Sequence, residues 1–198
     1  VQTCALPISD PQIRAVLAPL LPKVNSIPAH GELCACLKSP DAEFRKTATA
    51  VLKQVGGKTA YEILTGMLGE PDFPGRLEAA DVLVQKGGHH ALPGLAAMLR
   101  AGKTIEKAQA LKYLGDARLM AKDLPGAIRA IATALEDPEE RVVVYAIVAF
   151  GALCTEDDYF RHISPALDSP SVNVVRAAIE GLRRYDSPRA IAALERKF

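Results

Sequence analysis

The residues of this chain that could perform chemistry are its four histidines and four cysteines. Cys34 and Cys36 are two positions apart, and on a helix this spacing points their side chains to different faces, which suits neither a shared metal ion nor a disulfide. His89 and His90 are adjacent, whereas two histidines that hold one ion on a helix are normally four residues apart. We therefore expect no metal, no cofactor and no catalytic site, and we predict that the chain is not an enzyme.

The segment 56–59 reads Gly-Gly-Lys-Thr and is similar to the end of a phosphate-binding loop. The earlier glycine of such a loop is missing at the required spacing, and no strand pattern precedes the segment. We interpret the two glycines as the end of one helix before the start of the next. Because the cysteines are few and show no paired spacing, a reducing cytoplasm is the expected location.

Composition and charge exclude several classes of function. Lysine and arginine total 24, aspartate and glutamate total 23, the net charge is +1, and there is no tryptophan. Binding to nucleic acid needs a basic surface with aromatic side chains, so we expect no nucleic-acid partner. The longest stretch without a charged residue, 142–155, has 14 residues, which is too short for a helix that crosses a bilayer. We therefore expect no contact with a membrane.

The elements that would carry these residues follow a repeat of 31 residues, which is clearest in two columns of charged side chains. Aspartates open successive segments, and an insertion of three residues precedes the last two of them: Asp10, Asp41, Asp72, Asp137 and Asp168. A basic residue follows four positions after each of the first five slots: Arg14, Arg45, Arg76, Lys107 and Arg141. Lys103 stands where the fourth slot should have an aspartate, so we expect a gap in the charged columns there.

Apolar residues repeat with the same period. Two columns lie three and seven positions after the basic residue, and their members include Ala48, Ala79, Ala110 and Val144, then Leu52, Leu83, Leu114 and Val148. Positions four apart share one face of a helix, so these columns predict a buried stripe. Other apolar segments with helical spacing lie between them, at 30–37, 59–68, 89–99, 124–135, 158–167 and 188–194. We therefore predict an all-α fold, a right-handed α-solenoid of about five to six stacked helix pairs.

This pattern is similar to the HEAT repeat, and in particular to the short HEAT-like variety first described in phycobilin lyases. The segments that carry the resemblance best are SDPQIRAVLAPLL, SPDAEFRKTATAVLKQVGG and EDPEERVVVYAIVAFGAL. The resemblance implies that the second helices of the pairs form a concave binding surface. It also implies a ladder of charged side chains along the stacked turns, formed by Asp10, Arg14, Asp41, Arg45, Asp72, Arg76, Asp137, Arg141 and Asp168.

The resemblance covers 9–198, which we predict to be a single repeat domain. Residues 1–8 resemble the translation of a sequencing-adapter oligonucleotide, so we expect them to be non-native. The pattern begins on a second helix and ends on a first helix, as a fragment of a longer chain would.

We predict a scaffold for protein–protein interaction, whose protein partner and oligomeric state the sequence does not identify. The expected contact positions lie on the second helices, mostly one, two, five and eight residues past the basic column: Lys46, Thr47, Lys53, Glu78, Asp81, Gln109, Lys112, Val143, Ala146 and Arg183. Two alternatives stay open, a bilin lyase or isomerase subunit and a HEAT-like nucleic-acid-binding protein. HEAT-like hydroxylases that hold two iron ions use repeated His-Glu pairs, and this dipeptide does not occur here.

The helix expected at 139–153 is unusual because it is apolar on every side from Val142 onward. Either neighbouring helices cover it or a partner does. We favour cover by neighbouring helices, because repeat cores bury helices well. The alternative is a partner-binding patch around Val143, Ala146 and Ala149.

Overall fold

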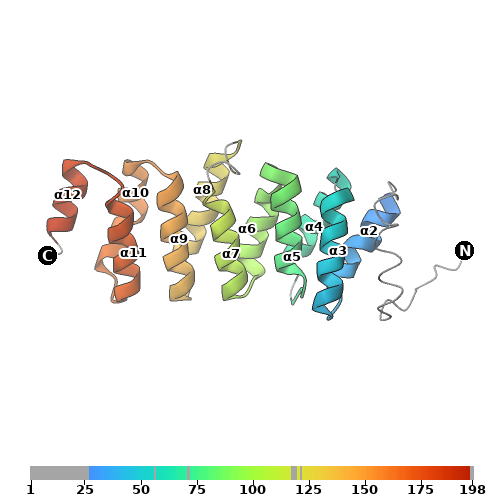
Figure 1. Ribbon diagram of the computed structural model, residues 1–198. Helices are drawn as coiled ribbons and strands as arrows, with labels where there is room; N and C mark the ends of the chain where they lie inside the picture. The colour runs from blue at the N-terminus through green and yellow to red at the C-terminus, as the bar shows by residue number, and fades with distance from the viewer. Residues whose placement is uncertain (1–26, 56, 71, 117–119, 121, 197–198) are drawn as a thin grey trace, which may run out of the picture.

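The computed structural model describes residues 27–55, 57–70, 72–116, 120 and 122–196. These residues form helices and no strand, and the helices stack side by side into an elongated array (Figure 1). The predicted all-α solenoid is therefore confirmed. Asp10, Arg14 and the segment 1–8 lie outside the described residues.

The described helices alternate between two layers. The first-helix layer contains α2 (Ile27–Ala35), α4 (Lys58–Leu68), α6 (Leu92–Ala101), α8 (Leu124–Thr133) and α10 (Glu156–His162). The second-helix layer contains α3 (Ala42–Val55), α5 (Arg76–Val82), α7 (Thr104–Leu114), α9 (Glu140–Leu153) and α11 (Val172–Leu182). Figure 1 shows the second-helix layer as a row in front of the first. These helices make five pairs, and α12 (Pro188–Glu195) follows them, in agreement with the five to six pairs expected.

Short turns of 3-10 or π-helical geometry adjoin several of these helices. Tight 3-10 turns follow three first helices at Cys36–Lys38, Ala134–Glu136 and Ser164–Asp168. A π-helical turn at Leu83–Gly87 continues α5, and a 3-10 turn at Gly88–Ala91 leads into α6. These turns keep the connections at the described places short, so the helices that they join lie next to each other.

Polar side chains fix where several helices begin. Asp123, Thr155, Ser171 and Ser187 each accept a hydrogen bond from the backbone N–H three residues further on. A cap of this kind satisfies an N–H group that has no partner within the helix, and it stabilises the helix by about 1 kcal/mol. The helix starts are therefore encoded locally, before any packing between repeats.

The core is one continuous cluster of buried apolar side chains that runs along the array between the two layers. The two predicted apolar columns are buried in α3, α5 and α7. Their small members, such as Ala48 and Ala79, leave room for close packing, and their leucines, such as Leu52 and Leu83, fill the space between helices. Each repeat buries its apolar face against the next repeat, as the solenoid requires.

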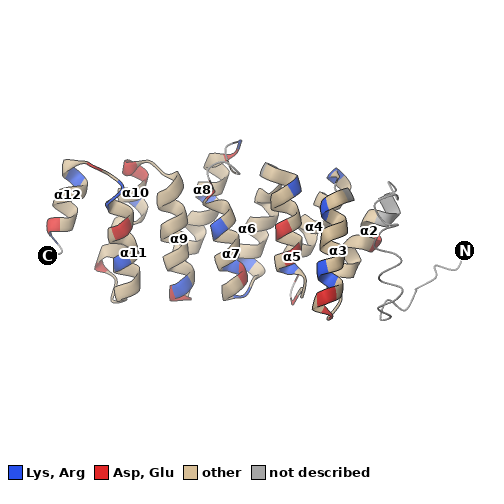
Figure 2. Cartoon of the chain, viewed as in Figure 1, with Lys and Arg blue, Asp and Glu red and all other residues tan. Residues whose placement is uncertain are grey.

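A second set of contacts joins neighbouring second helices near their first turns, where charged residues gather (Figure 2). Arg45 Nε donates to Glu78 Oε1 at 3.0 Å, and a guanidinium nitrogen of Arg76 donates to Glu106 Oε2 at 2.5 Å. Lys107 Nζ donates to Asp137 Oδ2 at 2.6 Å. Each pair spans about one repeat, so basic side chains link α3 to α5, α5 to α7, and α7 to the start of α9. The missing aspartate at Lys103 leaves no break in these links, because Glu106 accepts from Arg76 and Lys107 continues them.

The aspartates of the expected ladder have several different positions. Asp41 accepts hydrogen bonds from the N–H groups of Glu43 and Phe44, at 2.9 and 3.2 Å, and so caps α3. Asp137 accepts a hydrogen bond from the N–H of Glu139 while it binds Lys107. Asp72 is exposed with a φ of 52°, outside α5, and Asp168 is exposed in the turn before α11. Arg45 and Arg76 therefore pair with glutamates of the next repeat rather than with its opening aspartate.

The repeat changes its register between α7 and α9. The helices α3 and α7 begin 62 residues apart, which is two periods of 31, whereas α9 begins 36 residues after α7. The insertion is thus five residues and not the expected three, and Val143, not Arg141, occupies the place of Arg45. A difference of two residues rotates a helical position by about 200°. Ala146 is consequently buried and Val148 is 58% exposed, the reverse of our expectation for both.

Arg76 is the member of the charged links that matters most for stability. Its side chain is only 1% exposed, and it also donates to the backbone carbonyl of Glu70. We expect Arg76→Ala to lower the free energy of unfolding by about 3–5 kcal/mol, because it leaves the shielded carboxylate of Glu106 without its partner. Lys46→Ala removes a fully exposed pair with Glu43 and should change stability very little. Urea unfolding followed by circular dichroism compares the two variants, and equal losses would contradict this assignment.

The Lys107–Asp137 pair should make stability depend on pH. Burial raises the pKa of Asp137, but the hydrogen bonds from Lys107 and from the Glu139 backbone, with the charge of Lys107, lower it below its ordinary value of 3.8. The stabilisation is therefore complete above that value and is lost as the pH falls through the lower folded pKa. We expect Lys107→Met to unfold at a lower temperature than the wild type at neutral pH, and the difference to shrink in acid. The unfolding temperatures of both proteins are measured from neutral pH to a pH below 3.8. A difference that stays constant would show that protonation of Asp137 does not weaken its pair with Lys107.

Candidate functional site

A groove of about 560 Å³ lies between α7 and α9. One wall is formed by α7 and the residue after it, and the other wall by α9. The α7 side contributes Thr104, Ile105, Ala108, Gln109, Leu111, Lys112 and Gly115, and the α9 side contributes Arg141, Tyr145, Val148, Ala149 and Ala152. The volume is within the range of about 300–1,000 Å³ in which most ligand-binding clefts fall.

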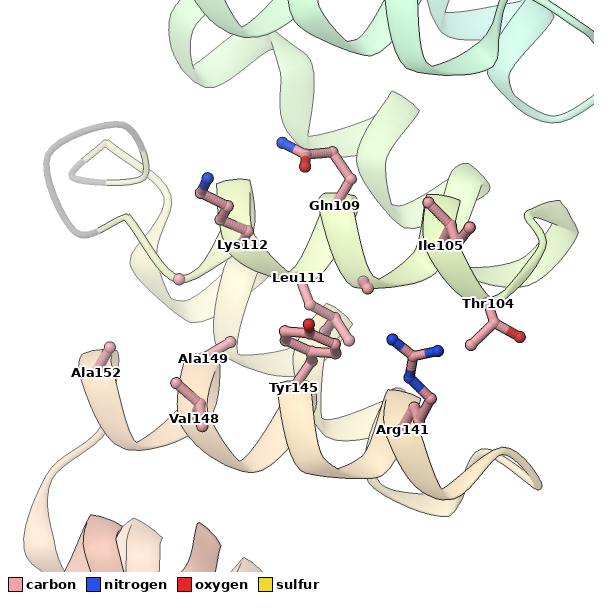
Figure 3. Close-up of a pocket in the computed structure, with 12 residues that line it drawn as sticks. Thr104, Ile105, Gln109, Leu111, Lys112, Arg141, Tyr145, Val148, Ala149 and Ala152 are labelled. Atoms are coloured by element: carbon pink, nitrogen blue, oxygen red, sulfur yellow. The ribbon is translucent and has the colours of Figure 1, made fainter. Parts of the chain in front are cut away.

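The two walls run in the same direction, so their residues face each other in a regular order (Figure 3). The guanidinium of Arg141 points toward Thr104 and Ile105, and Tyr145 stands further along the same wall. Lys112 lies at the other end of the groove, across from Ala149. The buried side chains of Leu111 and Ala149 form the apolar base between these ends.

Large apolar side chains are exposed along this groove. The exposed fractions are 69% for Ile105, 44% for Tyr145 and 58% for Val148. The apolar helix α9 is thus covered by its neighbours on one side only, where Val142 and Phe150 are buried. Exposed apolar side chains that cluster in one place are typical of a surface that binds another molecule.

The charge that lines the groove is positive. Among the described residues, Lys112 and Arg141 are the only charged ones that line it, and no described side chain forms a hydrogen bond or ion pair with either of them. Within the described part of the chain, Arg141 thus pairs with none of the residues of the ladder in which we expected it. Cations without partners at both ends of an apolar groove favour a ligand with negative charge.

Several predicted contact residues are already engaged within the chain. Lys53 Nζ donates to Asp81 Oδ2, which ties α3 to α5. Asp81 Oδ1 also accepts from Gln85 at 2.7 Å and from the Tyr113 hydroxyl at 3.3 Å, so it joins three helices. Burial and then the charge of Asp81 raise the pKa of Tyr113. This cluster links three helices of the second-helix layer, and both oxygens of its carboxylate accept hydrogen bonds within the chain.

The remaining predicted contact residues divide into three groups. Gln109 and Lys112 line the groove. Glu78 binds Arg45, Lys46 binds Glu43, Arg183 binds Glu180, and the Thr47 hydroxyl donates to the carbonyl of Glu43. Val143 is half-buried, and Ala146 is fully buried, so Ala146 cannot contact a partner.

The sequence-based selection missed Ile105, Tyr145 and Val148. The error follows from the register. Because α9 begins 36 residues after α7, Tyr145 is equivalent to Gln109 and Val148 is equivalent to Lys112. A signal for the correct register is present in the sequence. Glu139, two residues after Asp137, is the residue that immediately precedes α9, as Asp41 precedes α3.

The described residues with reactive side chains do not gather in one place. Among the described residues, no group of three or more His, Cys, Asp or Glu side chains is placed to hold a metal ion. Cys34 is buried in α2, and desolvation, with a smaller effect of Cys36, raises the pKa of its thiol to about 12. Cys154 follows α9, where its sulfur lies 3.5 Å from the Tyr185 hydroxyl.

Comparison with known proteins shows two similarities. Residues 31–115 match the family model described as HEAT repeats. Among solved structures, the chain is similar to one in the complex of CpcE and CpcF of phycocyanin lyase from Nostoc sp. PCC7120. The two are 26% identical with a TM-score of 0.46, and the match covers 93% of this chain and 76% of that chain. A search of curated proteins found no match. Within the described part of the chain, no helix is long and apolar enough to span a membrane.

One prediction from the sequence is corrected by this comparison. We predicted that the chain is not an enzyme, and its similarity to a chain of phycocyanin lyase, an enzyme, contradicts that prediction. We therefore withdraw it. The similarity assigns no reaction to this chain, and the bilin lyase alternative stays a prediction.

The register of α9 can be tested by placing a carboxylate at two neighbouring positions. Ala146→Glu buries an unpaired charge, so we expect it to lower the free energy of unfolding by at least about 2 kcal/mol. Val148→Glu projects into the open groove and should change the free energy by no more than about 0.5 kcal/mol. Urea unfolding of both variants decides the matter. A stable Ala146→Glu beside an unstable Val148→Glu would restore the register that we first predicted.

Proposed function

Because this chain carries HEAT repeats along residues 31–115, we propose that it is a scaffold that binds a partner protein in the groove between α7 and α9. The observation that supports this most directly is the exposure of Ile105, Tyr145 and Val148 along one groove. Burying these side chains against a partner would remove a large apolar area from water, which is the main favourable term in protein association.

The composition of the groove supports a protein partner. Tyrosine and arginine are enriched among the residues that contribute most to binding energy at protein interfaces, and the groove contains Tyr145 and Arg141. Along α3 and α5, by contrast, the charged side chains of the second-helix layer pair with each other, as Lys53 does with Asp81. A partner would have to break those pairs in order to bind there, so the groove is the favoured place.

The walls of the groove are fixed before a partner arrives. Leu111 and Leu114 of α7 and Phe150 of α9 are buried in the core, and Lys107 links α7 to Asp137, three residues before α9. At the end of α7, a Cβ atom added to Gly115 would lie only 3.1 Å from the Cα of Ala149, so the backbones of the two segments approach closely there. A preformed surface loses little conformational entropy on binding, which favours affinity.

The proposed location of this scaffold is the cytoplasm. Cys34, Cys36 and Cys154 are free thiols in the described residues, as is usual for proteins kept in a reducing compartment.

The proposed function is tested by photo-crosslinking in the cells that produce the protein. A photoreactive phenylalanine derivative replaces Tyr145 in the groove or, as a matched control, Arg129, which is exposed on α8 in the other layer. We expect a discrete protein adduct from position 145 and none from position 129. The identified partner, once purified, should bind the wild type at least about tenfold more tightly than the variant Y145S. Equal adducts from both positions, or none from 145, would overturn the proposal.

A further inference from the structure

We infer that the groove between α7 and α9 accepts an acidic amphipathic helix of the partner. Its apolar side chains would lie against Ile105, Tyr145 and Val148, and its carboxylates would pair with Arg141 and Lys112. This inference rests on the proposed function, and it specifies the chemistry of the segment that the scaffold recognises.

The charges of the groove are the first argument for an acidic ligand. The basic residues of the links between repeats already have carboxylate partners, as the Arg45–Glu78, Arg76–Glu106 and Lys107–Asp137 pairs show. Arg141 and Lys112 differ from them, because no described side chain pairs with either, and none of the described residues that line the groove is acidic. A ligand with carboxylates at both ends would satisfy the two cations, whereas a basic ligand would be repelled by both.

The spacing of the lining residues is the argument for a helix. On α9 four of the five groove residues recur at intervals of four, three and four positions: Arg141, Tyr145, Val148 and Ala152. The fifth, Ala149, lies next to Val148. A helix that lies along the groove repeats its own side chains with the same rise of about 1.5 Å per residue, so residues i, i+4 and i+7 keep step with this wall. The volume of the groove suits a few inserted side chains, while the body of the ligand helix would stay above it.

Nucleic acid fits this surface poorly. A phosphate backbone is bound by many cations along a continuous path, and the groove offers two cations separated by an apolar floor. The groove also exposes three apolar side chains, those of Ile105, Tyr145 and Val148. A phosphate backbone has no apolar groups to pack against them.

The probe is a fluorescein-labelled peptide of roughly 15 residues, long enough to populate a helix, with Leu at positions i, i+4 and i+7 and Glu at both ends. Two control peptides replace every Glu by Lys or every Leu by Ser. We expect the acidic peptide to bind with an affinity at least about tenfold above either control, as measured by fluorescence anisotropy. Circular dichroism of the complex should show a gain of helix in the peptide.

Charge reversal in the protein makes the test specific. The double variant R141E/K112E should bind the acidic peptide at least about tenfold more weakly and should gain affinity for the Lys peptide. The matched control is R129E, at an exposed position of α8, which should leave both affinities unchanged. The double variant Y145S/V148S should bind the acidic peptide more weakly but should still prefer it to the Lys peptide. Unfolding curves of all variants confirm that each is folded.

Three outcomes in these binding experiments would overturn the inference, and a fourth follows from combining them with the crosslinking. The first is equal binding of the Glu and Lys peptides, which would show that charge does not select the ligand. The second is a linear tetrapyrrole that binds where no peptide does, with a visible absorption change that R141E/K112E abolishes. The third is a dimer in sedimentation that Y145S/V148S converts to monomer, which would make the occupant a second copy of the chain. A crosslinked partner at position 145 with no binding of the acidic peptide would retain the proposed function and reject only this inference.

Discussion

The structure depends on one constraint: a pair of short helices can bury its apolar face only against the next pair along the chain. Several hydrogen bonds between neighbouring repeats reflect it, because their partners lie about one repeat apart. Arg45 reaches Glu78, Tyr185 reaches Cys154, and Ser187 reaches Glu156, at separations of 33, 31 and 31 residues. Every position in a helix therefore has its surroundings determined by the equivalent positions of the repeats before and after it.

This constraint explains why a change in repeat length has effects beyond the connection where it occurs. The extra residues between α7 and α9 leave the link from Lys107 to Asp137 intact, yet they turn the sequence of α9 relative to the repeat pattern. Tyr145 and Val148 consequently come to the surface opposite Gln109 and Lys112. The groove is thus a product of register, since neither wall contains an unusual helix geometry.

Much of the fold could be predicted from the sequence because its determinants are local and repeated. Ala48 with Leu52 and Ala79 with Leu83 have the spacing of one helix face, and all four are buried. The prediction failed at α9 because this helix has apolar residues on every side, so no polar face indicates its orientation. The acidic residues Asp137, Glu139 and Glu140 allow several alignments, and we chose Asp137 instead of Glu139 as the residue that opens the helix. The groove could not be predicted either. It lies between two helices, and the sequence pattern does not give the distance between them.

The links between neighbouring repeats have a consequence for how the chain reaches this structure. The contacts that hold one pair to the next close loops of about thirty residues, as the 30 positions between Arg76 and Glu106 illustrate. The entropy lost in closing a loop depends on its length, so each docking step carries a similar cost wherever it occurs in the array. Folding can then start at any well-packed pair and spread in both directions, and its rate is governed by local contact order rather than by the total number of residues.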